Sequence, residues 1–165
     1  MKKVESFKYV TMPFSMYEAL LAVDPGNQTG YAVFLPFRLT DAVRTPGDAW
    51  YLAHCGLGFP DASPRRFVIE MPQIYPRTPV PPNDIVKLAF QAGMYAGRMG
   101  NAEYVTPHEW KGNLPKELCG RRTLGKLSPE EREVYEKCVK GVAAGYRHNV
   151  QDAIGIGLFV LGRQG

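Results

Sequence analysis

Three carboxylates in this sequence lie next to apolar runs, where a charged group is expected to be partly buried and to need a partner. Asp24 follows the apolar run 20–23 and precedes a Pro-Gly turn, Glu70 follows the apolar run 67–69, and Asp152 opens the last apolar stretch of the chain. Burying a charged acid costs free energy unless something pairs with it, and a metal ion is a common partner. Clustered carboxylate oxygens suit hard cations, so these residues predict a Mg²⁺ or Mn²⁺ site. Two such ions about 3.5–4 Å apart can clamp the attacking and the leaving oxygen in phosphodiester hydrolysis.

Two side chains just before Asp152 are candidates to complete this site. His148 precedes Asp152 by four residues and Asn149 by three, and either spacing places the side chain on the helix face that carries Asp152. His148 could be a metal ligand, or a general acid or base near a scissile phosphate. Each acid alone also has an ordinary explanation, as a turn residue, a strand-end surface acid or a charge at a helix N-terminus. The metal-site interpretation therefore depends on the three acids together.

Apolar periodicity and turn residues predict the elements that must bring the acids together. Strands are expected over 19–24, 30–36, 49–57, 66–70 and 102–106, and helices over 83–99, 129–140 and 149–161. Three stretches rich in polar, Pro or Gly residues are expected to be irregular: 38–48, 72–82 and 111–126. This order resembles the ribonuclease H arrangement, an α/β fold with a mixed five-stranded sheet flanked by helices. No repeat or linker divides the chain, so one domain over 1–165 is expected.

The sheet and one helix explain how distant acids would meet. If the strands over 19–24 and 66–70 are parallel neighbours, Asp24 and Glu70 emerge at the same end of the sheet. A helix laid across that end would add Asp152. In the helix over 83–99, Asn83 is expected to be the N-cap. Gly93 and Gly97 lie four residues apart in it, and since each weakens a helix by about 1 kcal/mol, we expect close packing there, on the sheet or at a dimer seam.

Four short motifs resemble those of the RuvC-like Holliday-junction resolvases. They are Asp-Pro-Gly-x-x-Thr-Gly-Tyr-x-Val at 24–33, Val-Ile-Glu at 68–70, Tyr-Val-Thr-Pro-x-x-x-Lys at 104–111, and the stretch 148–158 around Asp152. The resemblance implies a ribonuclease H fold, a homodimer, and metal-dependent nicking of branched DNA. It implies that Asp24, Glu70 and Asp152 hold metal, with His148 or Asn149 in the fourth position.

The chain also departs from that family. The fourth position is usually Asp, or in some members His, three residues before the last Asp, and Asn149 stands there in this sequence. Family members carry an aromatic residue that enters the junction, and the loop 72–82 offers Tyr75 in its place. About eight residues separate the strands expected over 49–57 and 66–70, so the helix usual between them is expected to be absent. Such a compact variant is typical of a phage or other mobile element.

Basic residues indicate a polyanionic partner. The net charge is +4 and the isoelectric point is about 9.0, which is compatible with nucleic acid. With Trp110, a basic set is expected to follow the phosphate backbone of branched DNA, unless it is an ordinary solvated loop: Arg77, Lys111, Lys116, Arg121, Arg122 and Lys126.

Other features set the expected compartment and the rival functions. Three cysteines without C-x-x-C spacing, no signal peptide and no apolar run of membrane-spanning length predict a cytoplasmic protein, in host cytoplasm if phage-encoded, with no membrane partner.

The expected activity is that of a Mg²⁺- or Mn²⁺-dependent endonuclease on Holliday junctions or other branched DNA. The alternatives are a ribonuclease H-type nuclease on RNA or RNA/DNA hybrid and a catalytically inactive binder of branched nucleic acid. A sugar-kinase or actin-type fragment is disfavoured, because the chain is too short for two lobes.

Overall fold

The computed structural model describes residues 19–35, 38–46, 66–74 and 80–164. Its centre is a five-stranded sheet in the order β3-β2-β1-β4-β5. The strands are β1 (Leu20–Asp24), β2 (Gln28–Leu35), β3 (Arg38–Pro46), β4 (Arg66–Glu70) and β5 (Ala102–Val105). β1, β2 and β3 pair antiparallel, while β4 is parallel to both β1 and β5. The expected mixed α/β sheet is thus confirmed, and so is the parallel pairing of the two acid-bearing strands.

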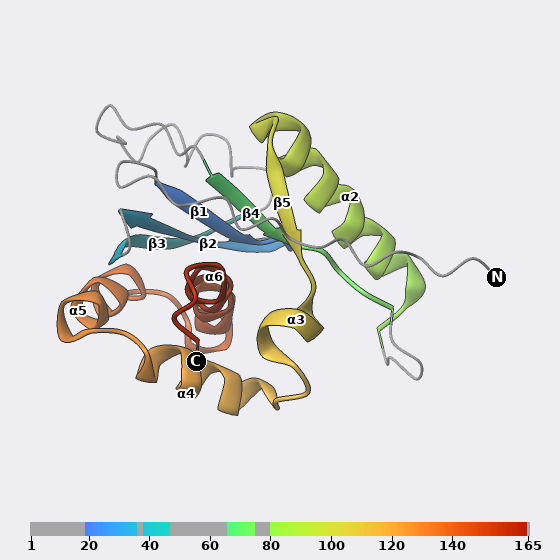
Figure 1. Cartoon of the computed structure of the whole chain (residues 1–165). Helices are drawn as coiled ribbons and strands as arrows, with labels where there is room; N and C mark the ends of the chain where they lie inside the picture. Colours follow the sequence, from blue (N-terminus) through green and yellow to red (C-terminus); the bar gives the residue numbers. More distant parts are fainter. Residues whose placement is uncertain (1–18, 36–37, 47–65, 75–79, 165) are drawn as a thin grey trace.

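Helices cover both faces of this sheet (Figure 1). One face carries α2 (Pro82–Met99), and the other carries α6 (Arg147–Val160), which Figure 1 shows between the sheet and the helices α4 and α5. The remaining helices are α3 (Pro107–Lys111), α4 (Lys116–Gly125), α5 (Pro129–Cys138) and the 3₁₀ turn η1 (Ala144–Tyr146). In the described part of the chain, no helix combines the length and the apolar character needed to cross a membrane.

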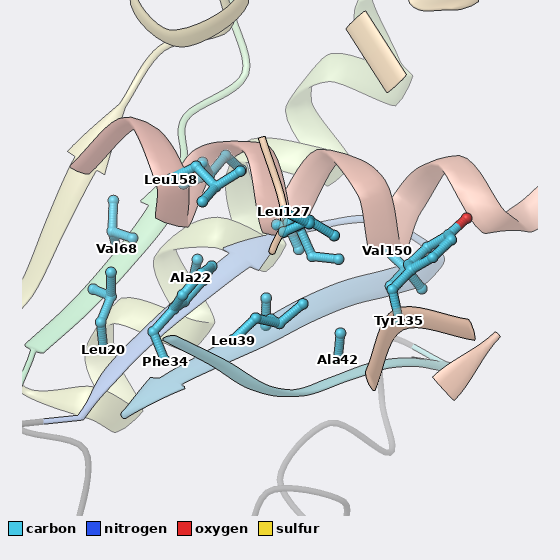
Figure 2. Packing of buried hydrophobic residues seen from close by; sticks show 14 of the residues in the cluster. Leu20, Ala22, Phe34, Leu39, Ala42, Val68, Leu127, Tyr135, Val150 and Leu158 are labelled. Carbon is cyan, nitrogen blue, oxygen red and sulfur yellow. The ribbon is translucent and has the colours of Figure 1, made fainter. Parts of the chain in front are cut away.

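The alternation of side chains along β1 and β4 decides which way their acids point. On β1, Leu20 and Ala22 pack in the α6-side core, while Leu21 and Val23 pack in the α2-side core. Figure 2 shows Leu20, Ala22 and Val68 beneath Leu158 of α6. Because successive strand residues alternate between faces, Asp24 and Glu70, two residues beyond Ala22 and Val68, belong to the α6 face.

Two sequence predictions about local structure are wrong. The stretch 38–48 was expected to be a polar loop, but β3 occupies Arg38–Pro46 and pairs with β2 along its length. An edge strand needs only one buried face: Leu39 and Ala42 are buried, while Arg38 and Thr40 are exposed, so its polar composition hid the strand. The segment 111–126 was expected to be irregular, but α4 fills most of it. The strand expected over 49–57 lies outside the described residues.

Helix α2 begins one residue earlier than expected. Its N-cap is Pro81, with no side-chain cap hydrogen bond, and Pro82 is the first helical residue. The expectation that Asn83 caps the helix is therefore wrong, because proline at the first turn already has the helical φ and lacks the N–H that a cap would satisfy. No heavy atom among the described residues lies within 4 Å of a Cβ built on Gly93 or Gly97. These glycines do not pack closely on their own sheet.

Candidate active site

The β1–β2 hairpin places the start of α6 over the carboxyl end of β1. A Cβ on Gly30 would collide with the backbone carbonyl of Asn149, so only glycine lets the helix approach this closely. The Asn149 side chain donates its Nδ2–H to the carbonyl oxygen of Gln28, at 2.9 Å. The Thr29 hydroxyl donates to the Gly26 carbonyl at 2.9 Å, which fixes the turn after Asp24. The motif Asp-Pro-Gly-x-x-Thr-Gly therefore supplies one acid of the site and also provides the surface on which the start of α6 packs.

Asp24, Glu70 and Asp152 form one electrostatic group. The pairing of β1 with β4 runs to Val23 opposite Ile69, so the next residues, Asp24 and Glu70, emerge side by side. Burial raises the pKa of Asp24 well above its usual range, and the charges of Glu70 and Asp152 raise it further. Burial also raises the pKa of Glu70 and of Asp152. These three carboxyls from three elements thus hold more negative charge than their surroundings favour.

Lys111 partly compensates this charge. Its Nζ lies 3.4 Å from Glu70 Oε2 and 3.8 Å from Asp152 Oδ2, and 4.6 Å from the centre of the Trp110 ring. Burial alone would lower the pKa of Lys111, but the carboxylates of Glu70, Asp152 and Asp24 outweigh it and raise the pKa. One ammonium among three carboxylates still leaves a net negative site.

The donor set fits a hard divalent cation. Its three carboxylates are the ligand type that Mg²⁺ and Mn²⁺ prefer. Burial raises the pKa of each carboxyl, so a bound cation would stabilise the ionised forms. Among the described residues, no three His, Cys, Asp or Glu side chains are already arranged to hold a metal ion. A metal would therefore have to draw the carboxylates together and take over part of the role of Lys111.

The two candidates for the fourth position lie in different surroundings. Asn149 uses its amide nitrogen on Gln28, which ties that side chain to the hairpin. The pKa of His148 is lowered, first by burial and then by the positive charges of Lys116 and Lys111. A neutral imidazole beside these lysines is available as a proton acceptor or a ligand.

The structure distributes the predicted DNA-binding residues unevenly. The side chains of Lys116, Arg121 and Lys126 are exposed on and after α4. Arg122 instead donates through Nη2 to the carbonyl oxygen of Trp110 at 2.8 Å and to Gln164 at 3.3 Å, so it ties elements together. Tyr75 and Arg77 lie outside the described residues.

Trp110 has a role that differs from the expected one. Its side chain is only 2% exposed, so the expectation that it follows a phosphate backbone is wrong. Its indole Nε1–H donates to Glu70 Oε2 at 2.5 Å. A buried tryptophan usually needs an acceptor for its N–H. The position of Trp110 directly before Lys111 was therefore the one sequence feature that could have indicated a bond to an acid of the site.

Comparison with solved structures identifies the architecture. The chain is similar to T. thermophilus RuvC in complex with a Holliday junction substrate, with a TM-score of 0.51, 15% identity, and coverage of 88% of this chain and 95% of that one. The fold is that of RuvC. A second Thermus thermophilus RuvC structure gives a TM-score of 0.45 at 15% identity, covering 85% of this chain and 91% of the RuvC chain. No protein-family model matches the chain, and no curated protein sequence matches it.

Proposed function

We propose that this protein is a metal-dependent endonuclease that cuts branched DNA, with the four-way junction as its substrate. The observation that carries the proposal is the group of three largely buried carboxyls with raised pKa values, gathered from β1, β4 and α6 in a RuvC fold. A similar RuvC chain has been solved with a Holliday junction substrate, which supports the choice of DNA shape.

Asp24, Glu70 and Asp152 would hold Mg²⁺ or Mn²⁺, with His148 or Asn149 in the fourth position. When bound, the metal supplies an activated water and neutralises charge on the phosphate. The chain's own groups complete the site. The Lys111 ammonium, freed from the carboxylates, is placed to bind a phosphate oxygen, and the neutral His148 imidazole to accept a proton. Either residue can fill the fourth position, because the hydrogen bond from the Asn149 amide nitrogen to Gln28 leaves Asn149 Oδ1 as a ligand atom.

Exposed cations on one helix would hold the DNA arms. Lys116 and Lys111 both lower the pKa of Asp24 and Asp152 through their charge, so α4 begins close to the acids. Lys116, Arg121 and Lys126 then continue the positive charge away from the site. Contacts of this kind bind the backbone without reading sequence, so selection would depend on branch shape and deformability.

We further propose that the active form is a homodimer built on the outer face of α2. Val86 and Phe90 are 65% and 73% exposed, and Gly93 and Gly97 continue the same stripe at helical spacing. No heavy atom of the described residues lies within 4 Å of a Cβ built on either glycine. A second α2 laid along this stripe would cover the apolar side chains. A two-fold dimer also supplies the two sites needed to cut both strands of a junction.

The test is cleavage by the wild-type protein of a labelled synthetic four-way junction in Mg²⁺, in Mn²⁺ and in EDTA. A linear duplex of the same arm sequence and an RNA/DNA hybrid are the matched substrates. We expect paired, symmetric nicks in the junction with either metal, none in EDTA, and little cutting of the duplex. Cutting of the hybrid alone would show that the substrate is an RNA/DNA hybrid and not a junction. Tight junction binding without cutting in either metal would show an inactive binder.

A further inference from the structure

Trp110 is buried in the candidate site and hydrogen-bonded to one of its acids. The indole N–H donates to Glu70 Oε2 at 2.5 Å, and the ring is almost completely buried. An indole has a single donor, and a buried donor without an acceptor is costly. The tryptophan and Glu70 therefore hold each other in place.

The ring of Trp110 is also locked against the helix that carries Asp152. A Cβ on Gly155 would collide with the ring, so the ring lies directly on α6 at a position three residues after Asp152. The backbone carbonyl of Trp110 accepts a hydrogen bond from Arg122. The start of α3 is closed by a capping box between Thr106 and Glu109. Through these contacts Trp110 fixes the position of Glu70 relative to α6.

The two donors to Glu70 both fall on the same oxygen. Trp110 Nε1 and Lys111 Nζ contact Oε2, and no described residue donates to Oε1 in the contacts around Glu70. A carboxylate held through one oxygen presents the other to a cation. The ammonium of Lys111 can move away when a cation arrives, because it ends a flexible chain. The indole cannot move away, because packing fixes it.

We propose that Trp110 is a positioning residue that holds Glu70 by Oε2 and leaves Oε1 free to ligate a divalent cation. The inference rests on the proposed metal-dependent function and goes beyond it, because it assigns metal affinity to a side chain that touches neither metal nor DNA. Groups that hydrogen-bond to metal ligands typically change metal affinity by 10–100-fold. The same hydrogen bond makes Trp110 a spectroscopic reporter of the state of Glu70.

The test is Mn²⁺ binding without DNA, followed by the electron paramagnetic resonance signal of free Mn²⁺. Trp110→Phe removes the N–H and keeps an aromatic ring, and we expect its Kd for Mn²⁺ to rise about 10-fold or more. Tyr135→Phe is the matched control. It also removes one hydrogen bond to α6, the 2.8 Å bond donated by Gln151, but it lies away from Glu70, and its Kd should be unchanged. Should Trp110→Phe fail to fold, benzothienylalanine at position 110 keeps the shape of the indole and lacks the N–H.

A second readout isolates the hydrogen bond itself. In a Trp50→Phe background the only indole N–H is that of Trp110, and its nuclear magnetic resonance signal should shift on Glu70→Gln and on addition of Mn²⁺. Wild-type Mn²⁺ binding with an unchanged Kd in the variant that lacks the N–H would overturn the inference and leave the proposed function standing. Absence of Mn²⁺ binding by the folded wild-type protein would overturn both.

Discussion

At the scale of single residues, the candidate site holds three carboxyls whose ionised form the fold disfavours. Desolvation and mutual repulsion raise the pKa of Asp24 most clearly, and Lys111 and Lys116 only partly oppose them. Negative charge held in this way lowers the stability of the metal-free protein and favours any cation that binds. In the proposed function, the stability lost in this way favours metal binding.

Asp24→Asn should for this reason stabilise the metal-free protein at pH 7. The substitution removes a carboxylate whose ionisation is disfavoured, and we expect a gain of about 1 kcal/mol, or about 2–4 °C in Tm for a chain of this size. Thermal melts in EDTA measure it. Adding Mg²⁺ should raise the Tm of the wild-type protein more than that of the variant. A lower Tm for the variant in EDTA would contradict the account of a charge-strained site.

The acids could be recognised from sequence, whereas the groups that hold them could not. Asp24 and Glu70 were recognisable because each ends a short apolar run, a local feature of the chain. Trp110 is 40 residues from its acceptor Glu70, and no local pattern links the two. The tie between Asn149 and Gln28, at a separation of 121 residues, was hidden for the same reason.

At the scale of elements, a few hydrogen bonds and close backbone contacts hold the strands and helices in their relative positions. Glu131 on α5 is 2% exposed. It accepts hydrogen bonds from the backbone N–H groups of Leu39 and Ser128 and from both terminal nitrogens of Arg163. This one carboxylate joins the edge strand β3, the start of α5 and the end of the chain.

The stability that Glu131 contributes should depend on pH. Burial alone would raise its pKa, but the bonds from Arg163, Ser128 and Leu39 lower it from 4.5 to about 2. A lowered folded-state pKa means that the contribution is fully present above the ordinary value and is lost as pH falls from 4.5 towards 2. Glu131→Gln should cost about 2–3 kcal/mol at pH 7, and much less near pH 2. Denaturant unfolding measures both, with the exposed Glu133→Gln on the same helix as the control; an equal cost at both pH values would contradict this.

Gly30→Ala should separate the hairpin from α6. The added Cβ collides with the Asn149 carbonyl, so the helix start must shift, and we expect a cost of about 2–3 kcal/mol. Because the same helix carries Asp152, metal affinity should fall as well. Gly125→Ala is the control, because no heavy atom in the described part of the chain lies within 4 Å of a Cβ built there, and it should be neutral or slightly stabilising. A Gly30→Ala protein with wild-type stability would show that the close approach is not needed.

The elements were predictable where their pattern was strong. The acid-bearing strand over 66–70 was predicted at its observed bounds, and the strand over 19–24 to within one residue, because buried central strands are continuous apolar runs. β3 was missed because an edge strand shows apolar residues on one face only and is specified by its partner β2. α4 was missed because Pro115 precedes it, Gly125 ends it and Gly120 lies inside it, where the helix approaches the Gln151 side chain closely.

At the scale of the whole molecule, the two sides of the sheet have different roles. α6 adds Asp152 to the face on which Asp24 and Glu70 lie, and α2 covers the other face and exposes an apolar stripe. The RuvC arrangement was predictable because the order of strands and helices follows from the apolar pattern of the chain. The proposed dimer depends on which side chains are exposed, and the sequence alone does not give exposure.

Phe90→Glu should convert the proposed dimer to a monomer. Phe90 is 73% exposed on α2, so the charge costs the monomer little and would be buried in a dimer at a high cost. Light scattering after size exclusion should give twice the mass of one chain for the wild-type protein and the mass of one chain for the variant. Leu118→Glu, on the exposed side of α4 at 48% exposure, is the control and should leave the mass unchanged. A monomeric wild-type protein would contradict the dimer proposal.

The most direct measurement of the central claim is cleavage of a labelled four-way junction in Mn²⁺ by the wild-type protein, Asp24→Asn and Asp84→Asn. Asp84 is a half-exposed acid on α2 that pairs with Lys87, so it matches the change in charge at a position outside the acid group. We expect symmetric nicks from the wild-type and Asp84→Asn proteins. For Asp24→Asn we expect a loss of at least about 100-fold with junction binding in EDTA retained. Cleavage by Asp24→Asn at the wild-type rate would show that the three carboxylates are not the catalytic site.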